Sequence, residues 1–101
     1  MLIDIKLSFV ETTSLFIKNI KIYGGDYYQW YVGISIDPKH SFLNIHEVDM
    51  LEKSWIISSE CPIDFAKYLK NFLITIGCLN NIELDLYEPG HNPRVYLYRM
   101  K

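Results

Sequence analysis

The segment from Pro62 to Gly77 restricts the fold more than any other, because it carries the clearest helical pattern in the chain. Its apolar side chains recur at helical spacing along one stripe: Phe65, Ala66, Leu69, Phe72, Leu73 and Ile76. Pro62 suits the first turn of a helix, and Gly77 suits a helix end. We therefore expect one main helix over about residues 62–77, lying with its apolar stripe on a sheet built from the rest of the chain.

Most of the other segments alternate apolar and polar residues, which is the period-two pattern of half-buried strands. We expect strands over residues 2–10, 15–23 and 27–37, joined by short turns into an antiparallel meander. Further strands are expected over residues 81–88 and 93–99. The sequence thus predicts an α+β fold, in which one helix covers one face of an antiparallel sheet of five or six strands.

The third expected strand has two different faces. One face carries Tyr28, Trp30, Val32, Ile34 and Ile36. Tyr27 and Tyr31 fall on the opposite face. Residues 41–58 are compatible with strand, helix and loop, so the sequence leaves their structure open.

Length and composition indicate a single domain over residues 1–101. The chain has 101 residues, of which 50% are hydrophobic, enough for one core without a metal or disulfide.

Ten Lys and Arg against twelve Asp and Glu argue against a nucleic-acid partner. Phe65 to Leu79, the longest mainly apolar stretch, is interrupted by polar residues, so no membrane span is expected. The start, MLIDIKLSF, has Asp4 and Lys6 within its apolar run and no small-residue cleavage site, so we expect no secretory signal and, by default, a cytoplasmic location. Two distant cysteines predict reduced thiols.

Residues that could carry chemistry lack the spacing that chemistry requires. His40, His46 and His91 form no metal-binding pattern with each other or with a cysteine. Cys61 stands at a helix start, where a thiol pKa can be lowered, but cysteine is more often a small buried residue. Glu83 and Asp85 fit a solvated strand face. We predict no catalytic residue, metal or cofactor.

Charge is distributed unevenly along the chain. Residues 44–64 contain five acids and one base, a net charge of −4. The acids are Glu47, Asp49, Glu52, Glu60 and Asp64. Trp55 lies within this segment, and both tryptophans suit the core, whereas Tyr27 and Tyr31 suit core and interface equally. Acids beside aromatic anchors are typical of a surface that attracts a basic partner, although the acids can also simply solubilise the domain.

Two segments carry a resemblance to a known family. GGDYYQWYVGISID, at residues 24–37, and EPGHNPRVYLY, at residues 88–98, resemble small immunity proteins of bacterial contact-dependent growth inhibition systems. The similarity covers about residues 1–37 and 80–99 and consists of hydrophobic strands and turns. It implies a cytoplasmic, non-enzymatic antidote that neutralises the toxin domain of a secreted effector, often a nuclease. Family members differ too much for site residues to be transferred.

The resemblance and the acidic segment together suggest one mechanism. We expect the acids to pair with Lys or Arg of a toxin and to occlude its active site. The candidate partner-binding acids are Glu47, Asp49, Glu52 and Glu60, and the candidate anchors are Trp55, Tyr27 and Tyr31. Two alternatives stay open: a homodimeric structural or regulatory domain, and an enzyme in which a histidine meets a carboxylate or Cys61.

Overall fold

Two helices and a four-stranded sheet make up the described part of the chain. The computed structural model describes residues 2–24, 26–37, 55–80 and 90–99. In chain order the elements are α1 (Phe9–Tyr23), the short 3-10 helix η1 (Tyr27–Gln29), β1 (Trp30–Ser35), β2 (Trp55–Ile57), α2 (Ile63–Thr75), β3 (Leu79–Asn80) and β4 (Arg94–Arg99). The protein is therefore α+β, as predicted, with two helices where one main helix was expected.

The sheet is mixed, with strand order β2-β4-β1-β3. β4 lies between β2 and β1 and is antiparallel to both, while β3 runs parallel to β1. The predicted antiparallel sheet of five or six strands is thus wrong for the described residues. A parallel pair needs a crossover connection, and α2 lies in the segment that leads to β3. The expected strand over residues 81–88 lies outside the described residues.

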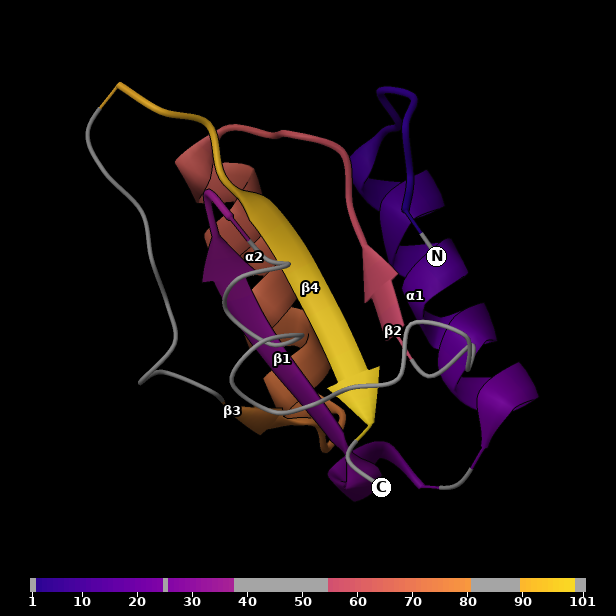
Figure 1. Cartoon of the computed structure of the whole chain (residues 1–101). Coiled ribbons are helices and arrows are strands. Elements are labelled where there is room, and N and C mark those ends of the chain that lie inside the picture. Colours follow the sequence, from indigo (N-terminus) through magenta and orange to yellow (C-terminus); the bar gives the residue numbers. More distant parts are fainter. Residues whose placement is uncertain (1, 25, 38–54, 81–89, 100–101) are drawn as a thin grey trace.

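Both helices pack on the same face of the sheet and run in the same direction (Figure 1). The predicted inward residues of β1, Trp30, Val32 and Ile34, belong to this core. β4 contributes Val95 and Leu97 to it, and the helices contribute Phe16, Ile20, Ala66, Leu69 and Leu73. Burial of this apolar surface is the main driving force for folding.

The opposite face of the sheet is aromatic. Its buried cluster consists of Trp55, Ile57, Tyr96 and Tyr98, with Tyr31 packed against it. Tyr31 and Tyr98 are cross-strand partners whose rings stack with centroids 5.5 Å apart. The rings of Tyr96 and Tyr98 also stack, at 6.0 Å. The sheet is therefore buried on both faces, which explains why β4 has an almost uninterrupted apolar sequence.

α1 covers the whole of the strand expected over residues 15–23 and the end of the strand expected over residues 2–10, and both of these predictions are wrong. Ser8 and Glu11 form a capping box: the Ser8 hydroxyl accepts the Glu11 N–H, and the Glu11 carboxylate accepts the Ser8 N–H. Phe16 and Ile20 then fall on the buried side of the helix. The strand prediction was wrong because a few β-branched residues can fit both the two-residue period of a strand and the 3.6-residue period of a helix. Among residues 2–8, Leu2 makes an isolated parallel bridge to Ile57.

α2 confirms the predicted main helix, and Gly77 ends it as expected. The Gly77 N–H donates to the Ile74 carbonyl and the Cys78 N–H donates to the Leu73 carbonyl, which together form a Schellman motif. Gly77 has φ +123°, a conformation that favours glycine.

Gly33 makes room for the aromatic face. It pairs with Tyr96 across β1 and β4, and a methyl group at Gly33 would overlap the Tyr96 ring. We expect Gly33→Ala to destabilise the protein by about 1–3 kcal/mol, because the ring must leave its position. Urea unfolding measures this loss. In a Tyr96→Val background the same substitution should cost much less, and an equal cost in both backgrounds would contradict the proposed contact.

Candidate functional site

The structure separates the seven predicted partner-binding residues into three groups. Glu47, Asp49 and Glu52 lie outside the described residues. Trp55 and Tyr31 belong to the aromatic face of the sheet, whereas Tyr27 packs beside Gly77 at the edge of the helical core. Glu60 is exposed. The four of these residues that the structure describes therefore do not form one compact cluster.

Trp55 has the environment of a core residue. Its side chain is 8% exposed and packs among Ile57, Tyr96 and Tyr98. The prediction that both tryptophans are core residues is thus confirmed, because Trp30 is fully buried on the other face. A side chain with so little exposed surface can contribute little contact area to a partner.

Tyr31 and Tyr27 are half-buried. Tyr31 stacks on Tyr98, and burial together with the neighbouring Tyr31 hydroxyl raises the pKa of Tyr98 well above its ordinary value. These tyrosines therefore contribute to packing and still present part of their surface.

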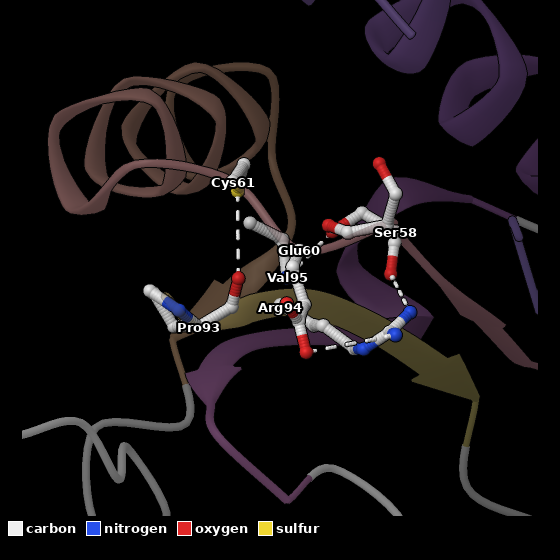
Figure 2. Close-up of polar contacts among 7 residues, drawn as sticks. Ser58, Glu60, Cys61, Pro93, Arg94 and Val95 are labelled. Atoms are coloured by element: carbon white, nitrogen blue, oxygen red, sulfur yellow. Dashed lines mark hydrogen bonds and ion pairs between the residues drawn. The ribbon is translucent and has the colours of Figure 1, made fainter. Parts of the chain in front are cut away.

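Glu60 follows the end of β2 and lies beside Arg94, the first residue of β4 (Figure 2). Its side chain is 65% exposed, and a carboxylate oxygen lies 4.0 Å from a guanidinium nitrogen of Arg94. An ion pair of this length at an exposed site contributes little to stability. The Glu60 carboxylate can consequently exchange Arg94 for a cation on another molecule.

The backbone around Glu60 is held firmly, in contrast to its side chain. Ser58 is buried, and its hydroxyl accepts the Val95 N–H at 2.8 Å and donates to the Ser59 carbonyl at 2.9 Å. The Arg94 guanidinium donates to the Ser58 carbonyl at 3.0 Å, as Figure 2 shows. On the other side, the Cys61 N–H donates to the Pro93 carbonyl at 3.0 Å. Glu60 is thus an exposed acid on a fixed segment between two anchors.

Cys61 and Cys78 are buried free thiols. Burial raises the pKa of each to about 11, and for Cys61 this outweighs the opposing effects of a hydrogen bond with Ser58 and the charge of Arg94. The Cys61 sulfur lies 3.7 Å from the Pro93 carbonyl oxygen, to which it donates. Both thiols are therefore protonated at neutral pH, which agrees with the interpretation of cysteine as a buried apolar residue.

The histidines offer no metal site within the described ranges. His40 and His46 lie outside them, and His91 is exposed beside the start of β4. Among the residues that the structure places, no group of three His, Cys, Asp or Glu side chains could hold a metal ion. Neither α1 nor α2 has the length and apolar character required to cross a bilayer.

Three exposed aromatic side chains were missed as candidate surface residues. Tyr28, expected to share the inward face with Trp30, lies in η1 and is 60% exposed, because the strand begins only at Trp30. On α2, Tyr68 is 69% exposed and Phe72 is 38% exposed. Tyr68 follows Asp64 at helical spacing, on the polar side, and this pattern could have indicated its exposure.

No protein-family model, curated protein or solved structure matches the chain.

Ser58 and Glu60 should differ sharply in their effect on stability. Ser58→Ala leaves the buried Val95 N–H without its acceptor, and we expect a loss of about 1–3 kcal/mol in the free energy of unfolding. Glu60→Ala should cost less than about 1 kcal/mol, because the Arg94 pair is long and exposed. Chemical denaturation measures both values. Equal losses, or a larger loss for Glu60→Ala, would contradict this division of roles.

The thiols should react slowly in the folded protein. At about pH 7.5 we expect a thiol-specific disulfide reagent to react with Cys61 and Cys78 far more slowly in the folded protein than in the unfolded protein. The reaction rate should rise as the pH approaches the pKa of about 11.

The raised pKa of the folded-state thiols also makes the free energy of unfolding depend on pH. The protonated thiols stabilise the fold below about pH 9, and this contribution is lost as the pH rises to 11. Rapid modification of either thiol at neutral pH would be incompatible with its burial.

Proposed function

We propose that this chain is a non-enzymatic immunity protein that binds and neutralises a cognate bacterial toxin domain. The observation that carries the proposal is Glu60, a 65% exposed acid in the connection between β2 and α2, whose backbone is held by hydrogen bonds at Ser58 and Cys61. Glu60 belongs to the segment of residues 44–64, whose net charge is −4. A fixed acid at the end of an acidic segment suits recognition of a basic surface better than it suits catalysis.

Occlusion of a basic active site is the proposed mechanism. Glu47, Asp49, Glu52 and Glu60 pair with Lys or Arg side chains of the toxin, and their field accelerates the encounter. A nuclease fits this charge pattern, because its active site must hold phosphates and is therefore often basic.

The aromatic contribution differs from the one expected from the sequence. Tyr27 and Tyr31, which are half-buried, can add contact area at the rim of the interface. Trp55 supports the surface from within the sheet, where it is 8% exposed. Glu60 lies near Arg94 at the start of β4, whereas Tyr31 pairs with Tyr98 near its end, so an interface that includes both extends along the strand.

Charge reversal tests the proposal directly. The triple variant Glu47→Lys, Asp49→Lys and Glu52→Lys should associate more slowly with the toxin and show a weaker dependence of the association rate on salt. Stopped-flow or surface-based kinetics at several salt concentrations measure the association rate. The probe is the protein encoded by the adjacent reading frame, because an immunity gene normally lies directly after the gene of its toxin. Glu60→Ala should increase the dissociation rate without loss of fold.

A matched control is available in the second acidic run. Reversal of Glu83, Asp85 and Glu88 to Lys changes the net charge by the same amount and should leave binding much less affected. If the first triple variant binds at the wild-type rate at all salt concentrations, the proposed interface is wrong. If the adjacent product does not bind the wild-type chain at all, the immunity role is wrong for that partner.

A further inference from the structure

The outward face of α1 combines apolar and cationic side chains around a shallow hollow. The hollow has a volume of about 360 Å³ and is lined by Ser14, Ile17, Lys18, Lys21 and Ile22. These positions recur every three or four residues and so occupy one face of the helix. The residues buried against the core, such as Phe16 and Ile20, lie on the other side.

The apolar part of this face is not required by the core. Ile22 is 57% exposed, and Val10, one turn before the hollow, is 72% exposed. Side chains of this size gain free energy when they are removed from water, so their burial in an interface would be favourable. Isolated exposed apolar residues are common, but here they flank a hollow and two charges.

The charges on this face lack partners in the described structure. Lys18 and Lys21 form no ion pair with any residue that the structure places. The acid of α1, Glu11, is engaged in the capping box at the helix start. Among the described residues, the hollow therefore presents two ammonium groups without an ion-pair partner, about one helical turn apart, beside the half-buried Ile17 and the exposed Ile22.

We propose that this face of α1 binds an acidic segment of a partner protein. Two carboxylates about 5 Å apart, the spacing of one helical turn, pair with Lys18 and Lys21. An apolar side chain of the same segment enters the hollow between Ile17 and Ile22. The charge of this face is opposite to that of the acidic segment of residues 44–64, so the two surfaces take different partners, and the inference does not depend on the toxin-binding role.

An acidic protein segment fits this face better than an anionic membrane does. Two lysines are attracted only weakly to an anionic lipid surface, which is too little for stable membrane binding without a larger apolar face. A peptide that supplies both carboxylates and an apolar side chain uses every feature of the hollow together.

A titration followed by amide NMR tests the inference. The probe is a soluble synthetic peptide that repeats the unit Glu-Glu-Leu-Glu-Glu-Ala. We expect shift changes concentrated in α1 between Ser14 and Ile22. Lys18→Glu and Ile22→Ser should each weaken binding by about tenfold, which corresponds to about 1.4 kcal/mol.

Matched variants lie elsewhere on the surface. Lys6→Glu makes the same charge change and Ile5→Ser the same change at a side chain that is 66% exposed, and both should bind the peptide as the wild type does. The inference is overturned if the peptide causes no change in α1, or if the control variants lose binding equally. Equal binding of polyglutamate would also overturn it, because the apolar part of the hollow would then have no role. The same holds if phosphatidylglycerol vesicles bind through Lys18 while the peptide does not.

Discussion

The antiparallel pairing of β1 with β4 is the interaction on which the rest of the structure depends. Six residue pairs join the two strands, from Trp30 opposite Arg99 to Ser35 opposite Arg94. β2 adds to the free edge of β4, and β3 adds to the free edge of β1. Both helices pack on the apolar side of this pair, so each other element is positioned by it.

The two faces of this strand pair are packed by different kinds of side chain. Toward the helices, branched aliphatic side chains and Trp30 fill an ordinary core. On the other face, Tyr31, Tyr98 and Tyr96 stack in series, and Gly33 provides the space that the last ring requires. Trp30 also anchors the end of α1, since its indole N–H donates to the Gly24 carbonyl at 3.0 Å while Arg99 lies over its ring. The result is a stiff sheet that can hold exposed groups such as Glu60 in fixed positions.

Elements whose neighbouring residues fit only one period, that of a helix or that of a strand, could be predicted from the sequence. These are the apolar stripe of α2, the end of α2 at Gly77 and the strand at Arg94–Arg99. α1 was missed because Phe16, Ile20 and Ile22 fit the two-residue period of a strand. The signal that favours a helix is the capping box of Ser8 and Glu11. The parallel pairing of β3 could not be predicted, because strand order depends on contacts between distant segments.

Of the candidate site, the core position of Trp55 could be predicted from the sequence, whereas its neighbours could not. Trp55 packs against Tyr96 and Tyr98, and this contact depends on the second, aromatic face of the sheet, which joins distant segments. Glu60 is an exposed acid of the acidic segment. Tyr28 lies outside β1 because the chain forms a 3-10 turn before the strand begins, and alternation alone does not reveal where a strand starts.

Native-state hydrogen exchange tests the central role of the β1–β4 pair most directly. We expect the hydrogen-bonded amides between Val32 and Ile34 in β1 and between Val95 and Leu97 in β4 to exchange only through global unfolding and to be the slowest in the protein. The amides of α1 and α2 should exchange at the same rate or faster. Slower exchange in a helix, together with opening of β4 below the global unfolding free energy, would contradict the central role of the strand pair.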